Sequence, residues 1–519
     1  MQTCLHWNCE ICTKAKEEIG VSQLPVNRNL EKEKYMNQEY DRIQALIKEA
    51  EAKAINGDEC LFRNGFHIMP PTGWLNDPNG LCQINGEYHL FFQYSPLDAR
   101  GGMKAWGHYV TKDFVNLTYL GAPFVPDEEF DKNGVYSGSS YVDNDGMHIF
   151  YTGNVKLPGD HDYTYSGRRA DTVLVESRDG RNFTEKKVVI DTDEYPKGYS
   201  CHIRDPKVWK EKDLYYMVLG ARTGNDEGRI LVYKSLDMKS WELTCEVGSK
   251  EKFGYMWECP DYFELDGTHV ISFSPQGLND EEYRYQNIYQ SGYVITDESP
   301  VSCKEMTIDE EKFIEWDMGF DFYAPQTFLN ESGRRIIIGW AGMPDAKYSN
   351  GEVEPENWQH CFTVPRELKV GKGKDEVMRV FQNPIKEIEA LRTGETVRII
   401  NSNKEYVSET GLMDIVCEGI TGEFDITIDG FVKFSYSSGT IALTLDDEHG
   451  FGRALRKAKI SDINSLRILV DSSIIEYYIN DGEMVFTTRF YKKQKQVKTV
   501  FDLNAEGITV YPMNKMTIS

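Results

Sequence analysis

Apolar residues recur at two different spacings along the chain, and the change falls near residue 60. Over residues 29–55 they follow three- and four-residue steps, a pattern that predicts a helix with one apolar stripe. Beyond residue 60, short runs alternate polar and apolar positions and are bounded by Gly, Asn and Asp, as in β-strands. We therefore expect a short helical N-terminal extension over residues 1–59, serving packing or dimerisation, on an otherwise all-β chain. The stripe of the helix consists of Ile43, Leu46, Ile47 and Ala50.

One plan, a polar motif followed by a strand, a tight turn and a second strand, occurs five times. Asn-Gly and Asp-Gly pairs at 85–86, 145–146 and 266–267 supply the positive-φ residues of two-residue hairpin turns. With the strand pairs between them, the repeats hold about four strands each, which is one propeller blade. We expect a five-bladed β-propeller over residues 60–365. The repeats start at Asn76, Tyr136, Arg204, Glu258 and Tyr323.

The remaining residues lack this repeat. Residues 366–393 are expected to form a linker that ends in a short amphipathic helix. Alternating strands resume over residues 394–519 and predict a C-terminal antiparallel β-sandwich. The sandwich carries no acid pair or metal-binding cluster, so we expect it to cover a propeller face or a subunit contact. A homo-oligomer is left open.

Composition and charge limit the kinds of partner and cellular compartment that we expect. The 519 residues carry a net charge of −25, which disfavours binding to nucleic acid or to an anionic membrane surface. No apolar run is long enough to span a bilayer, and the N-terminus lacks the pattern of a secretory signal, so we expect a cytoplasmic protein. The 11 scattered cysteines predict no disulfide framework. Cys4, Cys9 and Cys12 have a spacing known from iron–sulfur proteins but lack a fourth ligand, so neither metal nor cofactor is expected.

Three acidic residues of the repeats suggest glycosidic chemistry. Equivalent motifs of a propeller converge on its axis, so Asp77, Asp205 and Glu258 are expected to meet there. Retaining cleavage of a glycosidic bond needs a nucleophilic carboxylate and a proton-donating carboxyl about 5 Å apart. Arg204 would keep Asp205 ionised, and the neighbouring Trp and Cys would favour the protonated form of Glu258. Taken singly, the three also fit a turn residue, a surface ion pair and a rim glutamate.

Three segments, HIMPPTGWLNDPNG, RDPKVW and WECPD, resemble the signature blocks of glycoside hydrolase family 32, which includes invertases, inulinases and sucrose-6-phosphate hydrolases. HLFFQYSP, KAWGHYVTKD, VYSGSSYVD, GFDFYAPQTF and RRIIIGWAGMP extend the resemblance over nearly the whole propeller. It implies a propeller followed by a sandwich, with Asp77 as nucleophile, Glu258 as acid/base and Asp205 as transition-state stabiliser. Leu75 stands where Met is common, and residues 154–171 have no match. The implied fructose pocket consists of Asn76, Gln93, Trp106, Ser137, Arg204, Tyr323 and Trp340.

The expected activity is release of fructose from the non-reducing β-D-fructofuranosyl end of sucrose and short fructo-oligosaccharides. A sucrose-6-phosphate hydrolase and a fructosyltransferase remain alternatives, an arabinan-cleaving hydrolase lacks the extended NDPNG block, and a non-catalytic sugar-binding protein would not need all three carboxylates. A phosphorylated substrate would require local cations, for which Lys104, Arg222 and Arg284 are the candidates. Each is read more simply as solvated surface charge, so unphosphorylated sucrose is the expected substrate.

Overall fold

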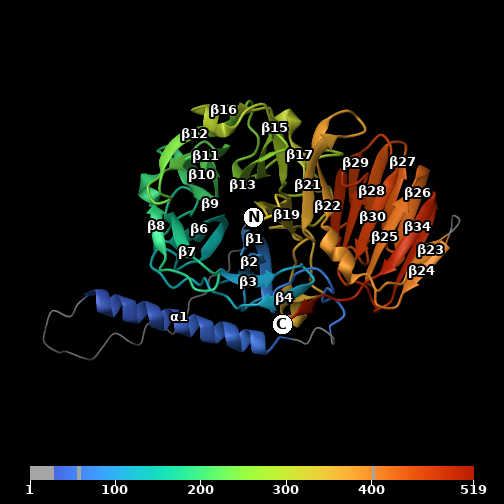
Figure 1. Cartoon of the computed structure of the whole chain (residues 1–519), viewed down its shortest axis with the longest axis horizontal. Coiled ribbons are helices and arrows are strands. Elements are labelled where there is room, and N and C mark those ends of the chain that lie inside the picture. The colour runs from blue at the N-terminus through green and yellow to red at the C-terminus, as the bar shows by residue number, and fades with distance from the viewer. Residues whose placement is uncertain (1–27, 55–59, 400–403) are drawn as a thin grey trace.

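A helix, a ring of five β-sheets and a two-sheet sandwich make up the computed structural model, which describes residues 28–54, 60–399 and 404–519 (Figure 1). The five sheets surround a central axis, and the sandwich packs beside the fifth sheet (Figure 1). The all-β fold class, with a five-bladed propeller, a C-terminal sandwich and a helical extension, is confirmed.

Each blade is one sheet whose strands follow one another outward from the axis. Blade one contains β1 (Gly73–Ile84), β2 (Glu87–Ser95), β3 (Ala105–Thr111) and β4 (Asn116–Tyr119), with β20 (Trp358–Gln359) and β35 (Thr517–Ile518) at its edges. Blade two contains β5 (Val135–Asp143), β6 (Gly146–Lys156), β7 (Arg168–Ser177) and β8 (Lys187–Ile190). Blade three contains β9 (Tyr199–Glu211), β10 (Leu214–Thr223), β11 (Gly228–Ser235), β12 (Glu242–Ser249) and β16 (Glu305–Ile308). Blade four contains β13 (Met256–Leu265), β14 (Thr268–Gln276), β15 (Gly292–Thr296) and β17 (Ile314–Glu315). Blade five contains β18 (Tyr323–Leu329), β19 (Arg335–Trp340), β21 (Arg366–Lys372) and β22 (Met378–Pro384).

The fifth blade extends past the expected propeller boundary at residue 365. Its outer strands β21 and β22 are residues that the pattern assigned to a linker. The short helix expected there is the 3-10 helix η6 (Lys386–Leu391), whose Ile388 and Leu391 are buried. We therefore propose a propeller that ends after Pro384. The other short helices are η2 (Thr192–Glu194), η3 (Pro300–Ser302), η4 (Glu310–Lys312) and η5 (Glu354–Glu356).

A register break interrupts the first strand of every blade at the repeated motif. The breaks lie between residues 75 and 78 of β1, 136 and 138 of β5, 258 and 261 of β13, and 323 and 326 of β18, and opposite residues 204–207 of β9. A bulge leaves residues unpaired and changes the direction of their side chains. The five motifs can thus present polar side chains instead of a continuous ladder of backbone hydrogen bonds.

The sandwich is built from two six-stranded antiparallel sheets around a core of Ile, Val, Leu and Phe. One sheet contains β23 (Val397–Ile399), β25 (Met413–Glu418), β30 (Ser465–Val470), β31 (Ile474–Ile479), β32 (Met484–Arg489) and β34 (Gly507–Pro512). The other contains β24 (Lys404–Ser408), β26 (Thr421–Ile428), β27 (Val432–Ser437), β28 (Thr440–Leu445), β29 (Leu455–Lys459) and β33 (Val497–Asn504).

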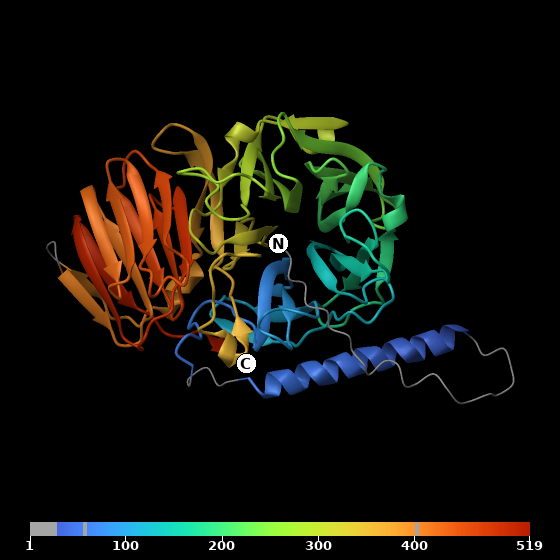
Figure 2. The same cartoon turned by 180° about the vertical axis from the view of Figure 1, so that it is seen from behind.

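Helix α1 (Arg28–Ala52) lies along the outside of blade one (Figure 2). Ile43 and Ile47 are buried in the core of that blade, whereas Leu46 is 36% exposed and Ala50 is partly buried. Two of the four residues in the predicted stripe therefore pack fully against the blade. Glu51 accepts hydrogen bonds from the hydroxyls of Tyr94 and Tyr119. The packing role of the helix is confirmed, and dimerisation stays a prediction.

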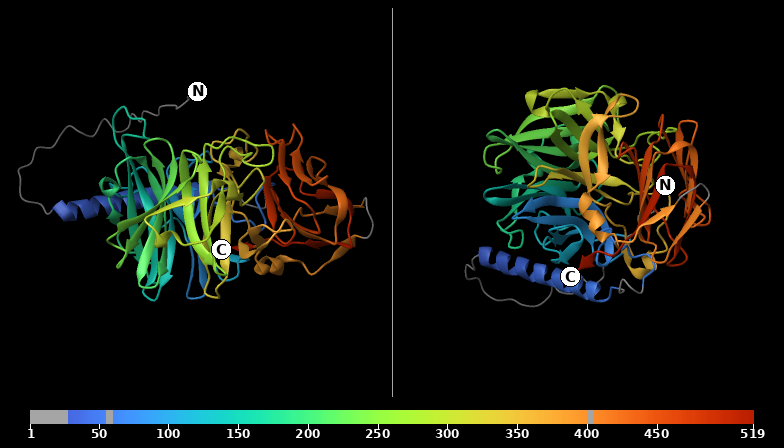
Figure 3. Two further views of the ribbon diagram at one scale, coloured as in Figure 1. Left: turned by 90° about the horizontal axis from the view of Figure 1, so that it is seen from above. Right: turned by 45° about the vertical axis from the view of Figure 1, so that its right-hand side comes forward.

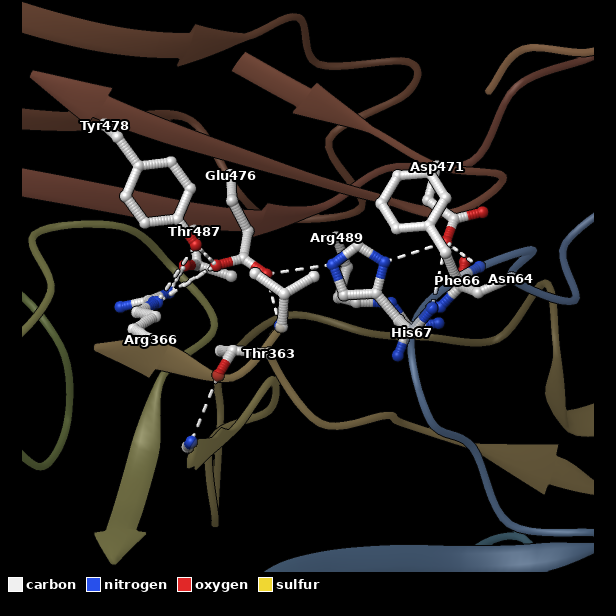
Figure 4. Close-up of polar contacts among 12 residues, drawn as sticks. Asn64, Phe66, His67, Thr363, Arg366, Asp471, Glu476, Tyr478, Thr487 and Arg489 are labelled. Atoms are coloured by element: carbon white, nitrogen blue, oxygen red, sulfur yellow. Dashed lines mark hydrogen bonds and ion pairs between the residues drawn. The ribbon is translucent and has the colours of Figure 1, made fainter. Parts of the chain in front are cut away.

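The sandwich packs against the side of the propeller (Figure 3). Buried ion pairs join the two domains (Figure 4). His67 lies between two sandwich carboxylates, with Nδ1 2.8 Å from Asp471 and Nε2 2.9 Å from Glu476. Arg366 of β21 approaches the other oxygen of Glu476 at 2.6 Å. All four side chains are fully buried, so the two domains share a polar interface that water does not reach.

The structure also bears on the expectations about disulfides and membrane-spanning segments. All eight cysteines within the described ranges are free thiols, and Cys4, Cys9 and Cys12 lie outside those ranges. No helix in the described part of the chain has the length and apolar character needed to cross a membrane.

Candidate functional site

The repeated motifs make contact through equivalent positions. At the first position of the motif, Arg204 contacts Glu258, and Glu258 contacts Tyr323. At the second position, Ser137 contacts Asp77, and the residue after Glu258 contacts Asp205. Convergence of the motifs at the axis therefore brings together residues that lie up to 246 positions apart in sequence, as the repeat predicts.

Asp77 is held by donors on both carboxylate oxygens. Ser137 Oγ donates to Oδ2 at 2.5 Å, and Asn76 Nδ2 donates to Oδ1 at 3.0 Å. Burial raises the pKa of Asp77, as does the charge of Glu258, whereas both donors and Lys104 oppose the rise. A carboxylate with fixed orientation and a raised pKa is a stronger base and nucleophile than a solvated one.

Asp205 is buried, with 6% of its surface exposed, and adopts a left-handed backbone conformation with φ of 61°. Its Oδ2 accepts the backbone N–H of Cys259 at 3.0 Å. Burial raises the pKa of Asp205; Arg204 opposes this, and Glu258 adds to it. The charge of Arg204 favours ionised Asp205, as expected from the sequence, although the guanidinium itself forms its ion pair with Glu258.

Glu258 lies among polar groups. Arg204 Nη2 is 2.7 Å from Oε1, and Gln276 Nε2 and the Tyr323 hydroxyl donate to Oε2 at 2.7 and 2.8 Å. The apolar surroundings expected from the neighbouring sequence are absent here, because the Trp257 ring turns into the core between blades three and four. The register break in β13 explains the difference, since it sends neighbouring side chains in different directions.

The other expected pocket residues form an inner support around the carboxylates. Gln93 Nε2 donates to two backbone carbonyls, and its Oε1 lies 3.4 Å from Ser137 Oγ. Trp106 has no exposed surface and donates to the carbonyl of Tyr136, so it lies beneath the site. Trp340 is 2% exposed and lies 5.8 Å from the partly exposed Trp74, centroid to centroid.

Sequence reasoning missed Gln276 and misjudged Lys104. Gln276 could have been found by counting the β13–β14 hairpin from its Asp-Gly turn, which places it opposite the segment around Glu258. Lys104 was considered only for phosphate, yet its Nζ is 3.2 Å from Asn76 Oδ1 and its charge acts on Asp77. Burial lowers the pKa of Lys104 to about 8, and Asp77 opposes this.

The arrangement suits acid/base and nucleophilic chemistry on a glycosidic bond. Two carboxyl groups close enough for their charges to interact, Asp77 and Glu258, lie in different networks of donors. A third carboxylate, Asp205, lies near both. Within the described ranges, no group of His, Cys, Asp and Glu has the geometry of a metal site.

Comparison with protein families identifies the chain. Residues 67–384 match the model described as glycosyl hydrolases family 32 N-terminal domain, and residues 424–518 match the family 32 C-terminal model. The chain belongs to glycoside hydrolase family 32. It is a fructofuranosidase-type glycoside hydrolase, which confirms both the resemblance and the enzyme class expected from the motifs.

Individual relatives align with this chain over most of its length. A sucrose-6-phosphate hydrolase of Bacillus subtilis is 37% identical over 457 residues, covering 86% of this chain and 92% of its own length. A raffinose invertase of Escherichia coli is 34% identical over 448 residues, covering 82% and 89%. The structure of sucrose-6-phosphate hydrolase from Lactobacillus gasseri superposes with a TM-score of 0.79 at 29% identity, covering 91% of this chain and 96% of that one.

Proposed function

We propose that this enzyme is a retaining β-fructofuranosidase whose preferred substrate is sucrose 6-phosphate, with Asp77 as nucleophile, Glu258 as acid/base and Asp205 as stabiliser. The observation that carries the catalytic assignment is the pair of carboxyl groups Asp77 and Glu258 at the axis, each oriented by its own donors. Retaining glycosidases use such a pair, one group attacking while the other protonates the leaving oxygen.

The reaction proceeds in two balanced steps. The carboxyl proton of Glu258 passes to the glycosidic oxygen while a carboxylate oxygen of Asp77 attacks the anomeric carbon, releasing the glucose part and forming a fructosyl ester. Glu258 then takes a proton from water, which attacks the same carbon and frees Asp77. Asp205 accepts hydrogen bonds from fructosyl hydroxyls. The Tyr323 hydroxyl, which can donate or accept, adapts to either protonation state of Glu258.

The proposed substrate, sucrose 6-phosphate, differs from the unphosphorylated sucrose that we expected from the sequence. The relatives from Bacillus subtilis and Lactobacillus gasseri, which are similar over most of their length, are both sucrose-6-phosphate hydrolases. The raffinose invertase is similar to nearly the same extent, so hydrolysis of unphosphorylated sugars stands as the second candidate. Sucrose, sucrose 6-phosphate, kestose and inulin, compared side by side by kcat/KM and product analysis, test the choice and also measure transfer to sugar acceptors.

The catalytic assignment is tested by the variants Asp77→Asn, Asp205→Asn and Glu258→Gln. Each is expected to lower kcat by several orders of magnitude in a folded protein, because each removes a group acting on the transition state. NMR of the first product formed in water with methanol should show the β-methyl fructofuranoside. An α-anomer as first product, or near-normal turnover by folded Asp77→Asn, contradicts the mechanism.

A further inference from the structure

We propose that Arg168 and Arg222, with His202 as a neutral positioning residue beside them, form the recognition site for a phosphate ester carried by the leaving glucose. The inference rests on the proposed function, since it assigns to particular residues the phosphate preference stated there. The three side chains come from β7, β10 and β9, so only the fold brings them together. They meet around the segment that leads into Arg168: His202 Nε2 lies 3.2 Å from the carbonyl of Tyr163, and Arg222 Nη2 lies 3.2 Å from the hydroxyl of Tyr165. The charges of Arg168 and Arg222 accordingly add to the effect of burial, which lowers the pKa of His202 to about 2.

The cluster lies on the side of the site where the leaving group must depart. The guanidinium of Arg222 lies over the ring of Tyr255, 4.6 Å from its centroid, and Tyr255 is three residues before the acid/base Glu258. Tyr255 contacts Tyr289, which packs at 6.1 Å from Tyr323, the hydroxyl donor to Glu258. Because the acid protonates the leaving oxygen, a glucose unit bound beyond Glu258 reaches toward Arg222.

Arg222 is held in place but retains free hydrogen-bonding capacity. Its guanidinium is enclosed by the rings of Tyr255 and Tyr165, and Nε and Nη2 donate to Asp226 and the Tyr165 hydroxyl. Nη1 has no protein partner among the described residues, and the side chain is 19% exposed. A guanidinium fixed in this way can bind a phosphate without losing further side-chain entropy.

Arg168 contributes a second cation with an unused donor. Its Nε is buried and has no hydrogen-bond partner within the described part of the chain, and burial lowers the pKa of Arg168 with a contribution from Arg204. An unpaired buried donor costs free energy, which an acceptor from a ligand would recover. Neutral His202 donates from Nε2 to the carbonyl of Tyr163, and its Nδ1 is then an acceptor. His202 therefore holds the loop beside the two arginines and does not itself bind the phosphate.

The cluster also explains the segment that had no match in the family blocks. Residues 154–171 form the end of β6, a loop and the start of β7, and they supply Tyr163, Tyr165 and Arg168. Tyr165 is 46% exposed and borders Arg222. The partly exposed Asp226 pairs with Arg222 and neutralises one of the two arginines, which leaves Arg168 as a further positive charge for a dianionic phosphate.

The two other cations considered for phosphate do not belong to this site. Lys104 lies on the nucleophile side, against Asn76. Arg284 donates to Tyr285 and to the carbonyl of Phe313 in blade four, outside the contacts of the catalytic groups. Arg284→Gln is therefore a matched control, since it removes one positive charge from the same chain without altering the cluster.

The experiment compares Arg168→Gln, Arg222→Gln and Arg284→Gln in the full chain, with thermal unfolding as a check on folding. The ratio of kcat/KM for sucrose 6-phosphate to that for sucrose is expected to fall roughly tenfold or more in each cluster variant, the effect of losing one charge-assisted hydrogen bond. The control keeps the wild-type ratio. Inhibition by glucose 6-phosphate should weaken in parallel, relative to inhibition by glucose. The two cluster variants are analysed separately, so failure of one to fold leaves the other decisive.

The outcomes separate this inference from the proposed function. A wild-type enzyme with no preference for sucrose 6-phosphate overturns the proposed substrate. A wild-type preference that survives in both cluster variants overturns the cluster assignment and leaves the substrate in place. Inorganic phosphate that inhibits as strongly as glucose 6-phosphate also overturns it, because the anion site would then be detached from the glucose subsite.

Discussion

Ser137 illustrates how a single hydroxyl orients Asp77, the proposed nucleophile. Its Oγ lies between Asp77 Oδ2 and Gln93 Oε1, and Gln93 is itself fixed by two backbone carbonyls. The carboxylate is thus oriented by a chain of contacts that ends on the backbone. Since the donor stabilises the ionised form of Asp77, it also partly offsets the rise in pKa caused by burial.

Ser137→Ala is expected to shift the acidic limb of the pH profile. Activity rises with pH as Asp77 ionises, and loss of the donor raises the pKa of Asp77 further, so the rise in kcat/KM moves to higher pH. A hydrogen bond to a charged group is worth about 1.5–3 kcal/mol, which corresponds to roughly one to two pH units. Ser139→Ala is the control, because Ser139 Oγ donates to the carbonyl of Pro206 instead. An unshifted limb would mean that Asp77 is not the group titrating there.

The convergence of the three acidic motifs could be predicted from sequence, but not the partners of their side chains. The motifs at Asp77, Asp205 and Glu258 follow from the repeat, and so does their convergence. The pairing of Arg204 with Glu258 could not be foreseen, because it depends on the bulges that redirect adjacent side chains. Adjacent residues of a regular strand point to opposite faces, so sequence neighbours are poor guides to the surroundings of a bulged residue.

Strand register explains why the elements were easier to predict than their ends. Hairpin turns fix the pairing of β13 with β14, and Gln276 follows from that count. The outer strands β21 and β22 were assigned to a linker because they lack the polar motif that opens each repeat. β21 pairs with β19, and β22 pairs with β21, through backbone hydrogen bonds. The pattern of side chains along the sequence predicts such pairing poorly.

Helix α1 offers a test of packing at the scale of an element. Ile47 is 2% exposed within the core of blade one, so Ile47→Ala should lower the free energy of unfolding by about 2–5 kcal/mol if the helix unfolds together with the propeller. Leu46→Ala, one position away and 36% exposed, should change it by less than about 1 kcal/mol. Urea unfolding followed by tryptophan fluorescence measures both. Equal effects would show that the helix does not pack as described.

The two domains are joined by charges rather than by apolar contact alone. His67, Asp471, Glu476 and Arg366 form a continuous buried network, in which each charged group has an opposite partner (Figure 4). Breaking such a network costs more than its net contribution, because a remaining partner is left buried and unpaired. The sandwich thus fixes the segment that leads into β1 and its nucleophile, a coupling that the sequence pattern of neither domain contains.

This network predicts a pH dependence of stability for the whole molecule. Burial alone would lower the pKa of His67, but the hydrogen bonds and charges of Asp471 and Glu476 outweigh it and raise that pKa. A group whose pKa is raised on folding stabilises the protein fully below its unfolded value, about 6.5 for His, and loses this contribution as pH rises. The free energy of unfolding of the wild type should exceed that of His67→Gln by a difference that shrinks above about pH 6.5. It should shrink by roughly 1.4 kcal/mol per pH unit until the pKa of His67 in the folded protein is reached.

Urea unfolding at several pH values between 5.5 and 9 measures this difference in the free energy of unfolding. His269→Gln is the control, since it removes a partly buried imidazole that contacts the hydroxyl of Tyr262 and lies outside the network of His67. A His67→Gln difference that grows from pH 5.5 to about 7 and is constant above would mean that His67 is neutral in the folded protein. The two carboxylates would then be held by Arg366 and by the backbone N–H groups of residues 65–67, which donate to Asp471, and the interface would carry one positive charge fewer.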